Sequence, residues 1–317
     1  MEHNLEGKTI NRRRLVFKRQ LVFGWTAVAI VTIIASLWAY WGGIENFYEG
    51  WYSESIWENI LMMLAQYWMF AIVFMIIGFI GVRFPKVSLF LNLALGIGAA
   101  IFFSGAAFST LWAMIIIPLA AIGLLFFFGV VKPRKIAYAL VIGLPALILL
   151  ITSIYGIVKI STRVDDGNYG ARVVEGRGGI CLIWAPEGPG WPENGVSYEE
   201  AVEICAHLSE DGTKLLDEEV NIWRLPTVEE AVASQMLHNE NAGGVWIKEE
   251  RRAEYELTPD KETPLWNPHS MIIYYWTATP AGEGKAYIIS YNGYVHPANI
   301  ENKYGYLSFR AVKECRE

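Results

Sequence analysis

The residues with the clearest potential for chemistry are three cysteines, Cys181, Cys205 and Cys315, and five histidines scattered along the 317-residue chain. Thiolates and imidazoles are the usual ligands of zinc, and paired thiols can also form disulfides. No two cysteines lie close together in the sequence, and no histidines cluster beside them. The sequence also contains no HExxH, CxxC, P-loop or EF-hand pattern. We therefore predict no metal site, no cofactor and no catalytic residue, although an oxidising compartment would let two of the three cysteines pair.

Three tryptophans are candidates for ligand contact because they lie in predicted loops. Trp191 falls in the Pro- and Gly-rich segment 185–195, and Trp246 and Trp266 fall in the charged segment 239–269. Aromatic side chains in loops add contact area at small entropic cost, which favours a binding face. The alternative is that they are ordinary surface tryptophans without a function.

Charge divides the chain into two halves of opposite character. Residues 1–163 carry 13 Lys/Arg and 6 Asp/Glu, whereas residues 164–317 carry 13 Lys/Arg and 26 Asp/Glu. Only 18% of all residues are charged, compared with roughly 25% in a soluble domain, and 53% are hydrophobic. This composition excludes a single soluble globule and a disordered chain. The acidic second half also excludes nucleic acid as a partner, because phosphate binding needs clustered Lys/Arg.

Five apolar stretches in the first half are long enough to cross ~30 Å of hydrocarbon as helices. The uncharged stretch 87–131 is too long for one crossing, and small and hydroxyl residues from Ser104 to Thr110 favour a turn within it. The first stretch exceeds the usual ~7–15 apolar residues of a signal peptide and no cleavage motif follows, so we expect a retained helix. The predicted spans are 21–41, 60–82, 87–105, 109–131 and 136–158.

Basic clusters predict the orientation of these spans. Lys/Arg residues precede the first span and separate the second from the third and the fourth from the fifth, whereas the loop 42–58 has four Glu and no Lys or Arg. Cytoplasmic flanks collect Lys/Arg, so we expect the N-terminus in the cytoplasm and residues 164–317 outside it. One long helix over 87–131 would reverse this orientation.

The predicted spans contain no Asp, Glu, Lys, Arg or His between their flanks. Ion and proton pathways usually need such groups, so a proton-coupled transporter is not expected. Gly96, Ala100 and Ser104 are spaced for close helix packing, either within the chain, which we favour, or across a dimer. Pro118 and Pro145 are expected to kink their helices. We therefore interpret this half as a hydrophobic anchor in the lipid bilayer.

The second half predicts an α+β domain with helices packed on a small sheet. Capping boxes, with Ser or Thr followed three residues later by Glu, predict helices starting after Ser197 and Thr227, and Cys205 falls on the apolar face of the first. The stretch 161–168 is expected to be a polar linker, and 238–269 a long loop with little regular structure. Strands are expected at 179–184, 271–277, 286–291, 294–296 and 308–312, with a tight primed turn at Asn292-Gly293.

Five short motifs follow one another in this half. They are VSYEEAVEICAHL at 196–208, WRLPT at 223–227 with two Glu shortly after it, YWTATP at 275–280, NG at 292–293, and FRAV at 309–312. In this order they resemble the Lcl C-terminal domain family, which is similar to the formylglycine-generating-enzyme and C-type-lectin-like superfamily. The resemblance covers roughly residues 170–314. It implies a lectin-like fold whose ends lie close together and whose loop-rich face often binds ligands.

The resemblance also implies roles for particular residues. It brings the first strand beside the last, which makes Cys181 and Cys315 a candidate disulfide. Formylglycine-generating enzymes use a copper-binding cysteine pair near the end of the fold, and this chain lacks that pair, so the resemblance does not carry catalysis with it. The motif residues interpreted as structural are Trp223, Arg224, Leu225, Pro226, Thr227, Trp276, Phe309 and Arg310.

Taken together, the sequence predicts an N-terminal all-α transmembrane bundle of five helices, residues 1–163, and a C-terminal α+β C-type-lectin-like domain outside the cytoplasm, residues 164–317. The expected function is recognition of a protein or a glycan at the outer surface, with the three loop tryptophans in the binding face. Two alternatives stay open: a structural subunit of a membrane complex, and an oxidase of the formylglycine-generating type.

Overall fold

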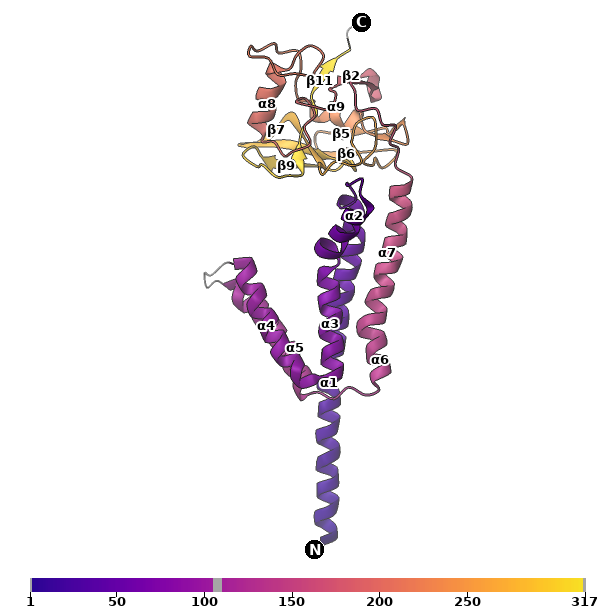
Figure 1. Ribbon diagram of the computed structural model, residues 1–317, viewed down its shortest axis with the longest axis vertical. Helices are drawn as coiled ribbons and strands as arrows, with labels where there is room; N and C mark the ends of the chain where they lie inside the picture. Colours follow the sequence, from indigo (N-terminus) through magenta and orange to yellow (C-terminus); the bar gives the residue numbers. More distant parts are fainter. Residues whose placement is uncertain (1, 105–109, 316–317) are drawn as a thin grey trace. The chain divides into compact units, whose positions relative to one another are not determined.

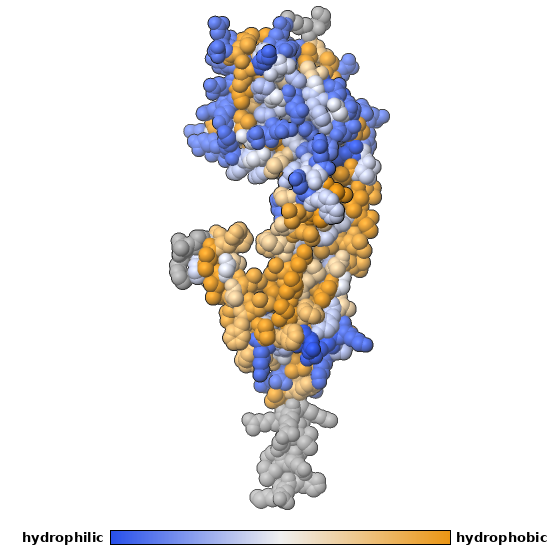
Figure 2. Space-filling model, in the orientation of Figure 1, coloured by the Kyte–Doolittle hydropathy of each residue, from blue (hydrophilic) through white to orange (hydrophobic). Residues whose placement is uncertain are grey.

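The computed structural model describes residues 2–104 and 110–315, and the chain forms two compact units (Figure 1). Unit 1 comprises Met1–Tyr48 and Ile60–Ile157, and unit 2 comprises Glu49–Asn59 and Val158–Glu317. Apolar residues cover the helices of unit 1, whereas the visible surface of unit 2 is largely hydrophilic (Figure 2). A helical first half followed by a sheet-containing second half is therefore confirmed.

Long apolar helices make up unit 1. The helices of the first half are α1 (Glu2–Glu49), α2 (Ile56–Met62), the π-helical segment η1 (Met63–Tyr67), α3 (Met69–Arg83), α4 (Pro85–Ser104), α5 (Thr110–Phe128), α6 (Arg134–Tyr138), the π-helical segment η2 (Ala139–Gly143) and α7 (Leu144–Ser161). The last residue of α1, the start of α2 and the end of α7 are assigned to unit 2.

Three to four of these helices can cross a membrane by length and composition. Within the described residues, Leu15–Phe47, Pro85–Phe103 and Arg134–Ser161 are long and apolar enough. A fourth span forms if Ile56–Tyr67 and Met69–Arg83, bent by 60°, count as one. The helix in the predicted span 109–131 ends at Phe128, three residues before the predicted end. The turn predicted between the third and fourth spans falls largely on residues 105–109, which lie outside the described residues.

The span 109–131 was predicted too long because its last residues leave the helix to pack on α1. The amide of Val130 donates to the carbonyl oxygen of Gln20 at 2.8 Å, which takes the backbone out of the α5 hydrogen-bond pattern. A Cβ on Gly24 would lie 2.5 Å from the Val130 carbonyl oxygen, so only glycine permits this approach. Contact with another helix therefore ends α5, and the apolar sequence pattern carries no sign of it.

Two π-helical segments interrupt the apolar helices, and the helix direction changes by 60° at the first of them. The amide of Trp68 donates to the carbonyl of Met63 at 2.9 Å, which inserts one extra residue into the turn before the 60° bend. The amide of Leu144 similarly donates to the carbonyl of Ala139 just before Pro145. Because Pro145 has no N–H to donate, the backbone compensates with a wider turn at the place where the sequence predicted a kink.

Small residues let α4 and α5 pack closely against each other. A Cβ on Gly123 would lie 3.0 Å from the Cα of Leu89, and a Cβ on Gly96 would lie 3.3 Å from the Cα of Ile116. Gly96 belongs to the predicted small-residue stripe, and its partner lies in the same chain. In the structure, Gly96 therefore packs against α5 of its own chain.

Unit 2 contains two main sheets and two short hairpins. The first sheet has the order β1–β2–β11, and the second has the order β10–β7–β8–β9. The strand bounds are β1 (Arg172–Glu175), β2 (Cys181–Trp184), β3 (Met236–Leu237), β4 (Glu240–Asn241), β5 (Val245–Ile247), β6 (Arg252–Glu254), β7 (Tyr274–Gly282), β8 (Lys285–Ser290), β9 (Val295–Asn299), β10 (Leu307–Ser308) and β11 (Val312–Glu314).

Two capped helices, α8 (Tyr198–His207) and α9 (Val228–Ala233), belong to unit 2. Ser197 and Thr227 form complete capping boxes with the glutamates three residues later, as the sequence predicts. α8 contributes Ala201 and Cys205 to a core that also contains Trp276 of β7. Helices therefore pack on a small sheet, which agrees with an α+β arrangement.

The segment 238–269 has little regular structure, as predicted, with the two-residue strand β4 and the short hairpin of β5 and β6 within it. Two other predictions for unit 2 need correction. The stretch 308–312 is not one strand, since β10 and β11 belong to different sheets and the residues between them cross from one to the other. The turn at Asn292-Gly293 gives a positive φ, 81°, to Gly293 but not to Asn292, so it is not the primed turn. The amide of Gly293 donates to the carbonyl of Ser290, and the amide of Ser290 donates to the carbonyl of Tyr294. The hairpin loop is therefore wider than the two-residue loop of a primed turn.

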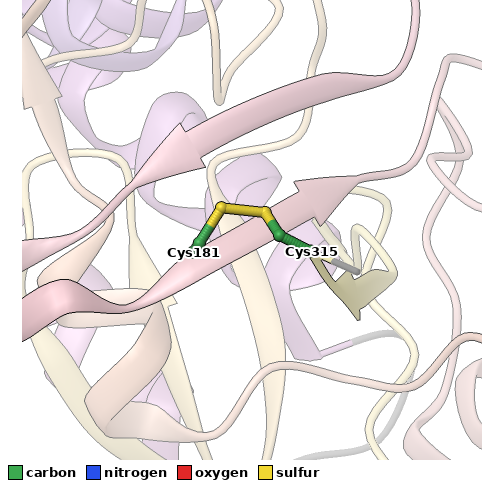
Figure 3. The surroundings of a disulfide bond; sticks show 2 residues. All are labelled: Cys181 and Cys315. Carbon is green, nitrogen blue, oxygen red and sulfur yellow. A yellow bond between two sulfur atoms is a disulfide. The ribbon is translucent and has the colours of Figure 1, made fainter. Parts of the chain in front are cut away.

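The first sheet is closed by a disulfide between Cys181 and Cys315 (Figure 3). Their Cα atoms lie 5.6 Å apart, because β11 pairs with β2 along its whole length. The bond joins residues 134 positions apart and so links the beginning of the unit to its end. Cys205, the third cysteine, is buried and free.

We expect replacement of Cys181 and Cys315 by alanine to lower the stability of unit 2 by about 2–4 kcal/mol, since the unfolded chain loses a long cross-link. Thermal unfolding of the full chain in detergent, followed by near-ultraviolet circular dichroism, measures the change. Cys205→Ala is the matched control, because it removes a thiol without removing a bond. Equal melting temperatures for the double variant and the wild type under non-reducing conditions would contradict this expectation.

Candidate functional site

The WRLPT motif connects a core residue to the start of α9. Trp223 is buried and donates from its indole Nε1 to the carbonyl of Ser209 at 2.8 Å. Leu225 belongs to the hydrophobic core, and Thr227 accepts a hydrogen bond from the amide of Glu230 at 3.2 Å. Each of these side chains therefore has a partner inside unit 2.

Arg224 holds the glutamate that caps α9. Its two terminal nitrogens lie 2.6 and 2.7 Å from the two carboxylate oxygens of Glu230, which is a bidentate arrangement. The same carboxylate accepts from the amide of Thr227 at 2.8 Å. Burial acts to raise the pKa of Glu230, but the hydrogen bonds from Arg224 and Thr227 outweigh it and lower the pKa below its usual value. Arg224 thus strengthens the local cap.

Arg310 is wholly buried and binds backbone carbonyls from three separate parts of the chain. It donates to Ala185 at 2.8 Å, to Pro264 and Leu265 at 2.5 and 3.0 Å, and to Gly170 at 3.4 Å. Burial lowers the pKa of Arg310 to about 9, which still leaves the guanidinium charged at neutral pH. These loops are therefore joined through one cation.

Two of the predicted ligand-binding tryptophans lie beside this buried cation. The guanidinium carbon of Arg310 lies 3.6 Å from the ring centroid of Trp191, whose Nε1 donates to the hydroxyl of Tyr275 at 2.6 Å. Trp266 stacks on Tyr275 with 3.9 Å between ring centroids. Trp191 and Trp266 are only 4% and 1% exposed. The prediction that they are exposed in a binding face is wrong. The loops that carry them pack around Arg310, although the sequence of these loops has few apolar residues that would indicate burial.

Trp246, the third candidate, lies on β5 and is half-buried. Its ring meets the edge of Tyr287 on β8, with 5.2 Å between centroids. It does not contact the other two tryptophans through any interaction recorded among the described residues. The structure thus does not bring Trp191, Trp246 and Trp266 together into one exposed surface.

The polar stretch 161–168, expected as a linker, belongs to unit 2 and packs within it. Arg163 pairs with Asp260 at 2.9 Å, and the amide of Val164 donates to the carboxylate of Glu262 at 2.9 Å. The amide of Thr263 donates back to the carbonyl of Val164 at 3.0 Å. Asp260, Glu262 and Thr263 are buried, and their polar groups find partners in this stretch. Residues 163 and 164 are thus packed within unit 2.

A cavity of about 360 Å³ opens on the second sheet of unit 2. Trp276, Ile288 and His296 are register partners across β7, β8 and β9 and so share a face, on which α8 covers Trp276 through an edge contact from Tyr198. The cavity borders this face at Ile288, His296 and Ala298. Side chains that line the cavity include Tyr274, Ile288, His296, Asn299, Tyr304 and Tyr306.

Aromatic rings form a continuous cluster around this cavity, which we call the tyrosine pocket. Tyr304 stacks on Tyr306 at 5.3 Å, and Tyr274 contacts Tyr306 at 5.9 Å and His296 at 5.3 Å between centroids. Tyr294 stacks on the other side of His296 at 5.4 Å. Ring faces of this kind bind flat apolar surfaces, and the polar side chains of Lys285, Asn299 and Asn302 add hydrogen-bonding groups.

His296 places a polar atom with no partner in the wall of the tyrosine pocket. Its Nδ1 is buried and has no hydrogen-bond partner among the described residues. Burial lowers the pKa of His296 below its ordinary value, so the ring is neutral at neutral pH. A neutral imidazole nitrogen can donate to, or accept from, a ligand hydroxyl according to its tautomer.

The tyrosine pocket was missed by the sequence interpretation. The alternation Tyr294, Val295, His296 signals that Tyr294 and His296 share one strand face, and Tyr304 and Tyr306 repeat the same spacing. Nothing in the sequence places these two pairs beside Tyr274. Pairing of β10 with β7 brings Tyr304 and Tyr306 to Tyr274. Pairing of β7, β8 and β9 brings Tyr294 and His296 to the same sheet.

The cysteines and titratable groups offer little for catalysis. Cys181 and Cys315 are bonded to each other, and burial raises the pKa of the Cys205 thiol to about 12. A protonated, buried thiol is a poor nucleophile and a poor metal ligand. In the described part of the chain, no group of three His, Cys, Asp or Glu residues is placed to hold a metal ion.

Comparisons with known proteins do not assign the chain to a family. No family model matches the chain, and neither a curated protein nor a solved structure matches it.

We expect Arg310→Met to destabilise unit 2 by about 3 kcal/mol or more, because several buried carbonyls lose their donor. Arg224→Met is the matched control. Because the Arg224 side chain is half-exposed, its replacement should lower the stability of unit 2 by only about 1 kcal/mol. Denaturant unfolding of the full chain, followed through the near-ultraviolet signal of the buried tryptophans, compares the two. Equal losses for the two variants would show that Arg310 does not have the central role assigned to it.

Proposed function

We propose that the protein is a membrane-anchored recognition protein whose unit 2 binds a glycan in the tyrosine pocket outside the cytoplasm. The observation that carries this proposal is the open aromatic cavity beside the core, with tyrosine rings, a neutral histidine and amide side chains around it. The binding face is placed here rather than at the loop tryptophans.

The size and composition of the tyrosine pocket suit a sugar ring. Its volume of about 360 Å³ lies at the lower end of small-ligand sites, which are roughly 300–1,000 Å³. Exposed tyrosine faces such as those of Tyr304 and Tyr306 can cover the apolar face of a pyranose, because each ring offers a rigid surface at low entropic cost. Asn299, Asn302 and His296 can then pair with hydroxyl groups. A neutral ligand is favoured, since Lys285 is the one Lys or Arg in the described lining and the lining includes no Asp or Glu to hold a metal ion.

The resemblance to the Lcl C-terminal domain family is consistent with this function. A lectin-like fold commonly uses its surface for recognition rather than for chemistry. The Cys181–Cys315 bond supports a location outside the cytoplasm, because such bonds persist mainly in oxidising compartments. The distribution of Lys/Arg between the apolar segments supports the same orientation.

We expect a reporter enzyme that is active only outside the cytoplasm to be active when fused after Glu317. The same reporter fused after Lys86, in the first turn of α4, should be inactive, because Lys/Arg-rich flanks of apolar helices stay in the cytoplasm. Activity in whole cells, corrected for the amount of fusion protein, is the measurement. The reverse pattern would overturn the orientation and the recognition function with it.

We expect the full chain in detergent to bind a subset of neutral glycans on a printed array, and Tyr306→Ala to weaken that binding about tenfold. Trp246→Ala is the matched control, since it removes an aromatic ring from the other side of β8. Titration calorimetry with the selected glycan measures both affinities.

Equal weakening by Tyr306→Ala and Trp246→Ala would place the site elsewhere. A parallel array of immobilised peptides distinguishes the classes of partner. Binding to peptides alone, lost in Tyr306→Ala, would keep the pocket and replace glycan by protein as its ligand.

A further inference from the structure

A second cavity lies in unit 1, where the cationic residues of the helical part gather. Arg83 is the last residue of α3 and Lys86 lies in the first turn of α4. Three more Lys/Arg residues follow α5 in the connection to α6 and the start of that helix. From Glu58 to Asp165 the sequence contains no other Asp or Glu. These cations are therefore not neutralised by carboxylates of their own segment.

The cavity has a volume of about 540 Å³ and is lined by residues from four parts of unit 1. It lies where α3 ends, α4 begins, α5 ends and α1 passes. Its lining includes Gln20, Arg83, Phe84, Lys86, Val87 and Phe128.

Backbone contacts hold the walls of this cavity in place. The amide of Val130 donates to the carbonyl of Gln20 at 2.8 Å, and Trp25 donates from Nε1 to the carbonyl of Lys132 at 3.1 Å. The close approach of Gly24 to Val130 allows no side chain between them. The connection after α5 is thus fixed against α1, and the cavity is part of the fold.

Charged and apolar groups lie side by side in the lining. The guanidinium carbon of Arg83 is 5.0 Å from the ring centroid of Phe84. Phe84, Val87 and Phe128 are 49%, 55% and 58% exposed. Neither Arg83 nor Lys86 forms an ion pair with a residue that the structure describes. The cavity therefore offers two cationic groups next to uncovered apolar surface, at the end of helices suited to a bilayer.

We propose that this cavity binds an anionic phospholipid, with the phosphate between Arg83 and Lys86 and an acyl chain along Phe84, Val87 and Phe128. A soluble phosphate would use the cations but leave the apolar surface exposed to water. A zwitterionic lipid would cover the apolar surface but leave an excess of positive charge. The proposal needs the helices to lie in a bilayer and does not depend on the tyrosine pocket.

Native mass spectrometry of the full chain in detergent tests the site with two probes, phosphatidylglycerol and phosphatidylcholine of identical acyl chains. The wild type should bind phosphatidylglycerol preferentially, and R83Q/K86Q should lose about tenfold in that affinity. R134Q/K135Q is the matched control, because it removes two cations near the same connection that do not line the cavity. The charge-preserving variant R83K/K86R should keep the preference.

Three results would overturn the proposal. They are equal binding of the two lipids to the wild type, an equal loss in R134Q/K135Q, and displacement of phosphatidylglycerol by inorganic phosphate at millimolar concentration. The last result would identify a soluble anion as the ligand.

A measurement on the wild type removes any dependence on how the variants fold. A photoactivatable phosphatidylglycerol analogue in nanodiscs should cross-link to residues 83–87 or 127–130. Cross-links confined to other segments would exclude this cavity.

Discussion

The arrangement of unit 2 depends on one buried cation. Arg310 lies between two strands of different sheets and donates hydrogen bonds to carbonyls far apart in sequence, at Gly170, Ala185 and the pair Pro264–Leu265. A buried guanidinium is costly unless its donors are satisfied, so these loops have to converge on it. Loops with little regular structure thereby acquire fixed positions. The aromatic stack of Trp191, Tyr275 and Trp266 then fills the space beside the cation.

This convergence also decides which surface remains for a ligand. The aromatic residues that surround Arg310 occupy one side of the β7–β8–β9 sheet and are no longer accessible. On the opposite face, α8 shares a hydrophobic core with Trp276, Ala286 and Ile288. That face also borders the tyrosine pocket, which lies directly beside the core and is therefore backed by buried residues such as Ile288 and Leu307. A binding site supported in this way is rigid, which favours recognition over induced folding.

Unit 1 follows a different physical rule. Its helices bury small residues against one another and expose large apolar ones, as Gly96, Gly123 and their neighbours show. In a bilayer, association of helices depends on such close packing because lipid provides no hydrophobic drive between them. Charge is confined to the flanks of the apolar stretches, where Arg83 and Lys86 border an apolar cavity. The same separation of charge from apolar length underlies both the proposed orientation and the proposed site for an anionic headgroup.

The sequence alone determined what depends on near neighbours. The apolar stretches, the capping boxes at Ser197 and Thr227 and the helical-then-sheet order could all be predicted, because each rests on contacts within a few residues. Tertiary structure alone decided burial and assembly. Trp191 and Trp266 are internal because they pack beside Arg310, which is more than 40 residues away in sequence but adjacent in space. Tyr274, His296 and Tyr306 form a pocket only once β10 pairs with β7. Local patterns report the propensity of a segment, whereas exposure and site geometry are set by long-range partners that no local pattern names.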